Sequence, residues 1–337
     1  MYLWKAPGTI PMQHYAAAVL SLLAGASALT AKAPAKAILR DMFAGRADGI
    51  LACPSTKEPL RRQTAVLGGF SRVSLSTRDS SKKYAVNEVF ADLVPSPSKI
   101  GLGELSEQIA QEVFSVFSMQ TGIFRTPLMA WYYERGWRQN FQQMGFPGID
   151  KEHAEVQEFF ADTADGGAVV DLSCGSGLMT RRLVASGRYS RVLGLDYSEA
   201  MLQETRQRFD EELIATDALT LVRADAGALP LASGSVDAVH AGAALHCWPR
   251  LEESLGEVAR ALKPGGCFFA TTFFEGAMPG QAAQQRQPGS GQMRMFKDEG
   301  ELVGLLLGAG FDGATLDVRR EGRACAIIRA RKTPCPE

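Results

Sequence analysis

Three aspartates and a glycine-rich turn are the residues of this chain whose types and spacing could hold a nucleotide-like ligand. The turn runs from Asp171 to Gly177 (DLSCGSG), and its glycines let a ligand come close to the backbone. The helix expected after the turn adds unpaired N–H groups, which suit a carboxylate. Asp196, 19 residues beyond Gly177, can accept two hydrogen bonds from the hydroxyls of a ribose. Asp225 is placed to accept a hydrogen bond from an adenine amino group.

Short apolar runs alternate with amphipathic segments over the second half of the chain, and the three aspartates stand at the ends of the first three runs. We predict strands over 168–172, 191–196, 220–224, 236–241 and 267–274. Ser198 can cap the helix after the second strand, and a last helix is expected over 298–307. Two closing strands, 315–319 and 324–330, flank a turn that suits an antiparallel hairpin. The pattern predicts an α/β fold: a mostly parallel sheet, an antiparallel last strand, helices on both faces, and a ligand site at the carboxyl ends of the strands.

The same stretches resemble the class I S-adenosylmethionine-dependent methyltransferases, particularly their type 11 branch. The resemblance covers roughly residues 165–275 and rests on VVDLSCGSG, GLDYSEAML, RADAGALP, SVDAVHAGAALHCWP and EVARALKPGG. The family pattern has glycine where Ser173 stands, a departure that tightens the first turn but leaves the two ligand-facing glycines. The resemblance implies a Rossmann-like methyltransferase fold with S-adenosyl-L-methionine as the cofactor.

Carried onto this sequence, the resemblance gives each part of the cofactor its own residues. The expected set is Asp171, Ser173, Gly175, Gly177, Asp196, Tyr197, Asp225 and Ala226. Asp171 would support the loop and the amino end of the cofactor, while Gly175 and Gly177 contact its methionine part. Asp196 would hold the ribose, and Asp225 with Ala226 the adenine. The alternative is a Rossmann fold that uses NAD, but the fingerprint G-x-G-x-x-G has Thr180 where its third glycine belongs.

Two segments, YYERGWRQNFQQMGFPG (Tyr132–Gly148) and GAALHCWP, look like a plant and algal plastid methyltransferase family of the plastoglobule type. Members of that family carry a transit peptide and, before the catalytic domain, a small cysteine-containing module. Cys53-Pro54 and Glu58-Pro59-Leu60 resemble the start of this module, but its partner cysteines are missing. Because one thiolate cannot close a tetrahedral zinc site, we expect a degenerate zinc-ribbon-like module without metal.

Methyl transfer is an in-line displacement, so positioning and desolvation can supply most of the catalysis. A base is needed only when the acceptor must lose a proton. His246, just past the fourth strand, is the candidate catalytic base; the alternative is that it only packs or hydrogen-bonds near the cofactor. His240, inside that strand, is expected to be a hydrogen-bonded core histidine.

The acceptor needs walls from outside the sheet, and two segments could supply them. The aromatic stretch Trp131–Phe146, with Tyr132, Tyr133 and Trp137, could form a roof over the site or simply pack in a core. The loop from about 275 to 293 is rich in glycine and glutamine, as expected of a lid.

The composition of the chain restricts the kinds of partner that it could bind. The 337 residues include 36 basic and 37 acidic side chains, with no basic stripe, which argues against a nucleic-acid partner and favours a small acceptor. No run of 18 apolar residues occurs, so we expect no transmembrane span, although peripheral association with plastid lipid bodies is compatible with the sequence. The six cysteines are scattered without a CxxC pair and are expected to be reduced.

The first 40 residues contain no acidic residue and include the small, apolar run Tyr15–Thr30, which is typical of a targeting peptide. The run alone fits an organelle transit peptide, a secretory signal with Ala26-Ser27-Ala28 as its cleavage site, or an ordinary helix. With the plastid resemblance it predicts import into the chloroplast, to the stroma or to plastoglobules.

The sequence thus predicts four regions: a targeting peptide (1–33), the degenerate zinc-ribbon-like module (34–98), a helical cap (99–160) and the methyltransferase catalytic domain (161–337). The predicted activity is methyl transfer to a small, hydrophobic acceptor, such as a prenylquinone or a pigment or lipid precursor. Two alternatives stay open: a cofactor-binding regulatory or scaffold protein without turnover, and a nicotinamide oxidoreductase.

Overall fold

The computed structural model describes residues 49–67, 70–94, 139–276 and 293–334, all of which lie in one compact unit. The predicted targeting peptide and the aromatic residues Tyr132, Tyr133 and Trp137 lie outside these residues, as do residues 277–292 of the lid predicted over about 275–293. In the part of the chain that the structure describes, no helix is long and apolar enough to span a bilayer.

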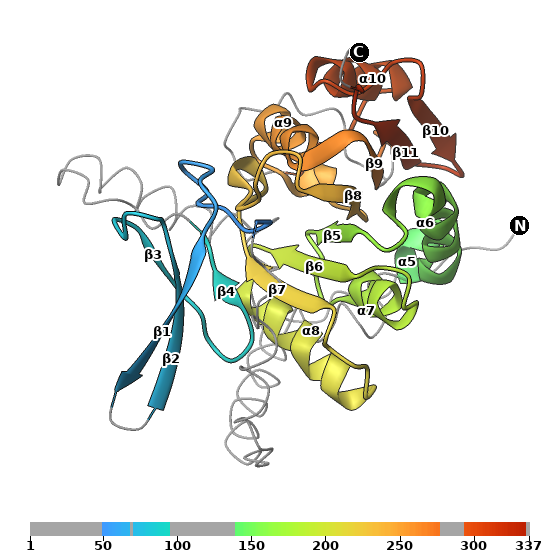
Figure 1. Ribbon diagram of the computed structural model, residues 1–337. Coiled ribbons are helices and arrows are strands. Elements are labelled where there is room, and N and C mark those ends of the chain that lie inside the picture. The colour runs from blue at the N-terminus through green and yellow to red at the C-terminus, as the bar shows by residue number, and fades with distance from the viewer. Residues whose placement is uncertain (1–48, 68–69, 95–138, 277–292, 335–337) are drawn as a thin grey trace, which may run out of the picture. The chain divides into compact units, whose positions relative to one another are not determined.

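Among the described residues, eight strands form one sheet in the order β10-β11-β9-β8-β5-β6-β7-β4 (Figure 1). The strands are β4 (Ala91–Asp92), β5 (Ala168–Leu172), β6 (Arg191–Asp196), β7 (Leu219–Arg223), β8 (Val236–Ala241), β9 (Leu262–Phe273), β10 (Asp317–Glu321) and β11 (Cys325–Arg331). Neighbouring strands from β4 across to β9 are parallel, whereas β11 is antiparallel to both β9 and β10. The predicted Rossmann-like class is confirmed. The strand order reverses around β5, the place where sheets of this kind bind ligands.

The predicted strands agree closely with the observed ones near the ligand edge and less well elsewhere. Three of them, 168–172, 191–196 and 236–241, have the predicted bounds, and β7 begins one residue earlier than predicted. The strand predicted over 267–274 begins at Leu262, because Leu262 pairs with Val236 before an irregularity in the register. The closing hairpin is antiparallel as predicted, but its first strand begins two residues later.

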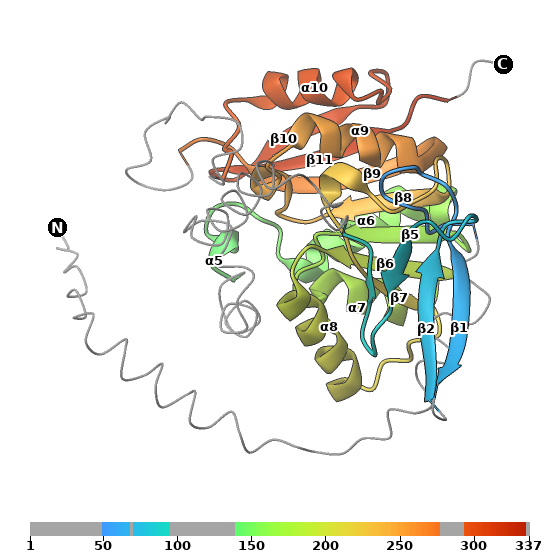
Figure 2. The same ribbon diagram turned by 90° about the vertical axis from the view of Figure 1, so that its left-hand side faces the viewer.

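Helices cover both faces of the sheet (Figure 2). They are α6 (Ile149–Ala164), α7 (Leu178–Ala185), α8 (Glu199–Glu211), α9 (Leu251–Ala261) and α10 (Glu299–Gly308). Consecutive strand residues point to opposite faces, and the core divides in the same way. Val170 of β5 belongs to the cluster that includes Leu255 of α9 and Leu306 of α10. Val169 belongs to a second cluster with Phe160 of α6 and Leu183 of α7.

The helices after β5 and β6 differ in how their first turns are capped. Ser198 caps α8 as predicted, since its hydroxyl accepts a hydrogen bond from the backbone N–H of Met201. The helix α7 follows Gly177 with no side chain capping it. Its first N–H groups are therefore left to other acceptors, as a helix next to an anionic ligand group requires.

The N-terminal module forms a second, antiparallel sheet of β1 (Arg61–Leu67), β2 (Phe70–Ser76) and β3 (Lys83–Ala85). Beyond it, β4 leaves the module and joins the main sheet beside β7 (Figure 1). Cys53 is buried, and its sulfur lies 3.1 Å from the hydroxyl of Tyr84. Among the described residues, no group of three or more His, Cys, Asp or Glu side chains could hold a metal ion.

A short segment before α6 is held on the C-terminal hairpin by two glycines. This segment contains α5 (Gln139–Gln142) and ends at Gly148. A Cβ on Gly145 would lie 2.2 Å from the carbonyl oxygen of Glu321, and one on Gly322 would lie 2.5 Å from the Cα of Gly145. The N–H of Ala324 also donates to the carbonyl of Met144 at 2.8 Å. Backbone contacts therefore hold this part of the helical cap predicted over 99–160 against the hairpin.

Candidate cofactor site

The glycine-rich turn is tied to the second strand and to α8. The N–H of Gly175 donates to Asp196 Oδ2 at 2.9 Å, and the N–H of Cys174 donates to the carbonyl of Leu195 at 3.0 Å. From the other side, the hydroxyl of Thr205 in α8 donates to the carbonyl of Gly175 at 2.9 Å. The turn therefore has a fixed conformation beside the carboxyl ends of β5 and β6.

Asp196 lies at the centre of this arrangement. Its other oxygen, Oδ1, accepts a hydrogen bond from the N–H of Ser198 at 2.8 Å. Burial raises the pKa of Asp196 to about 6, although the N–H groups of Ser198 and Gly175 partly offset burial; the charge of Asp171 adds to the rise. At neutral pH the carboxylate is ionised, and its remaining lone pairs can accept hydroxyl groups.

Asp171 points into the core rather than to the surface. Its oxygens are within hydrogen-bond distance of Thr180 Oγ1, at 2.5 Å, and of His240 Nδ1, at 2.8 Å. The other ring nitrogen of His240 lies 3.0 Å from Glu152 Oε1 on α6, and all three ionisable side chains are buried. Burial lowers the pKa of His240, but the hydrogen bonds to Asp171 and Glu152 outweigh it and raise the pKa to about 9. His240 is thus a cation between two carboxylates, and no local pattern predicts Glu152 as its partner.

Gly177 provides the close approach between the turn and α8. It has a φ of +80°, and a Cβ there would lie 2.5 Å from Thr205 Cγ2. We expect Gly177→Ala to lower the free energy of unfolding by about 2–4 kcal/mol through strain and overpacking. Gly187 is the matched control: its φ is +66°, but its Cβ would meet nothing within 4 Å, so Gly187→Ala should cost only about 1 kcal/mol. Equal losses in urea unfolding would refute the contact with Thr205.

Ser173, which replaces the glycine of the family pattern, keeps the backbone conformation that a glycine would have. Its φ is +59°, in the left-handed region that costs a non-glycine residue of the order of 1 kcal/mol. In exchange, its hydroxyl accepts a hydrogen bond from the indole N–H of Trp248 at 3.0 Å. The serine therefore links the turn to the segment after β8.

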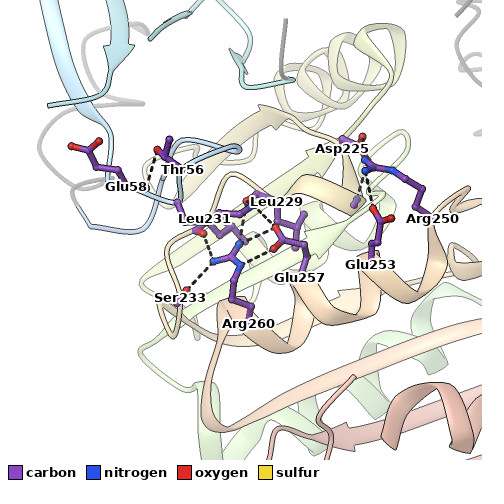
Figure 3. A network of polar contacts seen from close by, with 12 residues as sticks. Thr56, Glu58, Asp225, Leu229, Leu231, Ser233, Arg250, Glu253, Glu257 and Arg260 are labelled. Atoms are coloured by element: carbon purple, nitrogen blue, oxygen red, sulfur yellow. Dashed lines mark hydrogen bonds and ion pairs between the residues drawn. The ribbon is translucent and has the colours of Figure 1, made fainter. Parts of the chain in front are cut away.

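Asp225 is engaged by the protein on both oxygens. Oδ1 accepts from the N–H of Gly227 and caps the short 3-10 helix η3 (Ala226–Ala228). Oδ2 forms an ion pair with Arg250 at 2.7 Å, and Arg250 also pairs with Glu253 of α9 (Figure 3). The sequence did not single out Arg250, which stands directly beside the residues predicted to hold the adenine. Tyr197, another member of the expected set, has the guanidinium of Arg223 over its ring, 5.4 Å from the ring centroid.

His246 is placed at the carboxyl end of β9, in the 3-10 helix η4 (Leu245–Cys247). It is buried; its Nδ1 lies 3.4 Å from Thr272 Oγ1, and its ring packs edge-on against Phe273 at 4.8 Å. Phe141 and Phe146, from the predicted aromatic roof, pack on the same Phe273 at 5.1 and 4.5 Å. The structure thus brings the candidate base together with the described end of the aromatic segment.

Comparison with known proteins agrees with this geometry. Residues 170–270 match the family model described as a methyltransferase domain. Two uncharacterized chloroplastic methyltransferases of Arabidopsis thaliana are 41% and 42% identical over 229 and 231 residues. Each match covers 66% of this chain, and 62% and 61% of the two relatives.

More distant relatives match a smaller part of the chain. A ubiquinone/menaquinone biosynthesis C-methyltransferase of Acidiphilium cryptum is 32% identical over 165 residues, which are 43% of this chain and 66% of the relative. Among solved structures, Haemonchus contortus phosphoethanolamine N-methyltransferase 2, in complex with S-adenosyl-L-methionine, aligns with a TM-score of 0.50 at 17% identity. The alignment covers 62% of this chain and 60% of the solved chain, and at this identity it supports the fold alone. With the matched residues, the strand order and the chloroplastic relatives in view, the domain at residues 170–270 belongs to the type 11 S-adenosylmethionine-dependent methyltransferases.

Proposed function

We propose that this protein transfers a methyl group from S-adenosyl-L-methionine to a small, hydrophobic acceptor. The observation that carries the proposal is the glycine turn tied to Asp196, with Asp225 two residues beyond the neighbouring strand. These groups fit the parts of the cofactor: an uncapped helix start for its carboxylate, a half-buried carboxylate for the ribose and a second carboxylate for the adenine.

The protein's own contribution to this reaction is binding and orientation. When bound, the cofactor supplies a methyl group on a sulfonium centre that already carries its leaving group. Gly175 and Gly177 would contact the methionine part, Asp196 the ribose, and Asp225 with Ala226 the adenine. Asp171 would act indirectly, by supporting the turn, because its oxygens are hydrogen-bonded to Thr180 and His240 inside the core.

The aromatic contacts around Phe273 favour a ring-bearing acceptor. Phe141, Phe146 and His246 surround Phe273 at the carboxyl end of β9, which β8 separates from β5, the first strand that carries cofactor residues. Such rings offer apolar faces to a substrate of the same kind. The name of the Acidiphilium relative, a quinone C-methyltransferase, is consistent with a prenylquinone-like acceptor.

The activity is tested by incubating the purified protein with methyl-labelled cofactor and fractionated plastid lipids. We expect label in a hydrophobic, ring-bearing product. Binding of the cofactor without transfer to any fraction would instead favour a regulatory or scaffold protein. Tight binding of NAD in place of the methyl donor would overturn the cofactor assignment.

We propose that His246 accepts the proton that the acceptor loses. Replacing it by alanine should flatten the acidic limb of the pH–rate profile, because the group whose protonation stops the wild-type reaction is gone. The control is Thr272→Val, which removes the hydroxyl 3.4 Å from His246 Nδ1 and should keep the limb. A His246→Ala profile with the wild-type shape would make the residue a packing element only.

We further propose that the protein acts in the chloroplast, in keeping with the names of the two Arabidopsis relatives. N-terminal sequencing of the native protein should find that roughly the first 30–45 residues have been removed, a length typical of such targeting peptides. An intact Met1 on a cytosolic protein would contradict this.

A further inference from the structure

The N-terminal module is bonded to the segment that follows Asp225. Residues 50–52 run beside residues 230–232: the N–H of Ala52 donates to the carbonyl of Pro230 at 2.9 Å, and the N–H of Ala232 donates to that of Ile50 at 2.8 Å. Leu51 and Leu231 form an antiparallel bridge between these hydrogen bonds, and both are buried. The segment that begins at the predicted adenine site thus has the module as its neighbour.

An ion-pair network also holds the segment that follows Asp225, at the carbonyls of Leu229 and Leu231. Arg260 of α9 donates to the carbonyls of Leu231 at 2.8 Å and Leu229 at 3.2 Å, and it pairs with Glu257 (Figure 3). Lys57 of the module contacts two of these three partners: its ammonium lies 2.6 Å from Glu257 and 3.2 Å from the carbonyl oxygen of Leu229. The backbone beyond Asp225 is therefore held jointly by α9 and by the module.

A second connection reaches the ribose side. The N–H of Leu93 donates to the carbonyl of Arg223 at 3.0 Å, and Asp92 pairs with the guanidinium of Arg223 at 3.1 Å. Arg223 in turn donates to the carbonyl of Tyr197 at 3.1 Å, directly after Asp196. Asp92 therefore acts, through Arg223, on the backbone next to the residue predicted to hold the ribose.

We infer that the module of residues 49–94 is a positioning element for the adenosine half of the cofactor site. It holds the segments 196–199 and 225–232 in the geometry that accepts a nucleoside, and Lys57 and Asp92 are its positioning residues. The inference rests on the proposed function, since it takes these two segments as the nucleoside-binding ones. It assigns the module a role that needs no metal.

The test uses the full chain and the variants Lys57→Ala and Asp92→Ala. Calorimetry should show that each variant binds adenosine and S-adenosyl-L-homocysteine about three- to tenfold more weakly than the wild type, as expected when one contact of a coupled pair is lost. In methyl transfer, KM for the cofactor should rise by the same factor while kcat at saturating cofactor stays unchanged. Lys57→Arg, which keeps the cation, should restore the affinity.

Lys151→Ala is the matched control. Lys151 pairs with Glu321 of β10, so its loss removes a comparable ion pair on the opposite edge of the sheet and should leave adenosine affinity unchanged. If an alanine variant does not fold, Lys57→Gln and Asp92→Asn, which keep the side-chain volume, supply the measurement. Variants that melt at lower temperature but bind adenosine like the wild type would overturn the inference. A wild-type protein that binds neither adenosine nor the cofactor would instead refute the proposed function.

Discussion

Replacing His240 by leucine is expected to lower the free energy of unfolding by about 3–5 kcal/mol, the range measured when one partner of a buried ion pair is removed. The reason is that Asp171 and Glu152 are both buried and both have His240 as a hydrogen-bond partner. Without the cation, two carboxylates face each other in the core. Urea unfolding measures the loss directly.

The double variant Glu152→Leu/His240→Leu is the control for this prediction. It removes one of the two carboxylates that contact His240 together with the histidine, so it should recover part of the stability that His240→Leu loses. A double variant less stable than the single one would show that Glu152 contributes in another way.

The pH dependence of the same contribution has a definite sign. The pKa of His240 is about 9 in the folded protein and 6.5 in the unfolded chain. The stabilising effect of the protonated histidine is therefore present in full below pH 6.5 and is lost as the pH rises through 9. The stability difference between the wild type and His240→Gln, which carries no charge, should therefore shrink between these values. A difference that is constant from pH 6 to 10 would contradict a protonated His240.

Asp196→Ala is expected to weaken binding of S-adenosyl-L-methionine by about 1.5–3 kcal/mol, the scale of hydrogen bonds to charged groups. Calorimetry at neutral pH measures the change, and circular dichroism shows whether the turn held by Asp196 is intact. Asp210→Ala, an exposed member of an ion pair on α8, is the control and should bind as the wild type does.

Affinity should also depend on pH through Asp196. Burial raises the pKa of this carboxyl to about 6, and only the ionised form has all its lone pairs ready to accept the ribose hydroxyls. Below pH 6, the dissociation constant of the wild type should therefore increase by up to about tenfold per pH unit, with a flatter response in Asp196→Ala. A wild-type affinity that does not change between pH 5 and 8 would refute the ribose assignment.

The sequence predicts well what local patterns determine. The runs that form β5, β6 and β8 are mostly apolar, each is buried along most of its length, and the sequence predicts their bounds to the residue. The start of α8 has a capping serine, and the turn has its glycines, so the elements around the predicted cofactor residues could be placed without a structure.

Contacts between distant residues could not be predicted in this way. His240 and Glu152 are 88 positions apart, and nothing in the helical pattern of α6 marks Glu152 as a buried residue that needs a cation. Asp92 and Arg223 are 131 positions apart, and β4 is two residues long, too short to leave a strand pattern. Such partners are selected by the folded arrangement rather than by the neighbouring sequence.

Within the described residues, the two edges of the main sheet bear on whether the protein associates with itself in solution. An outer strand with free N–H and C=O groups can template pairing with another chain, and charged side chains guard against this. At one side, β10 (DVRRE) is such a charged strand. At the other, β7 (LTLVR) is apolar, and its end is paired with β4 and Leu93. A shortened protein that begins after residue 94 would uncover the end of that apolar strand, at Val222 and Arg223, and it should associate with itself more readily than the longer chain.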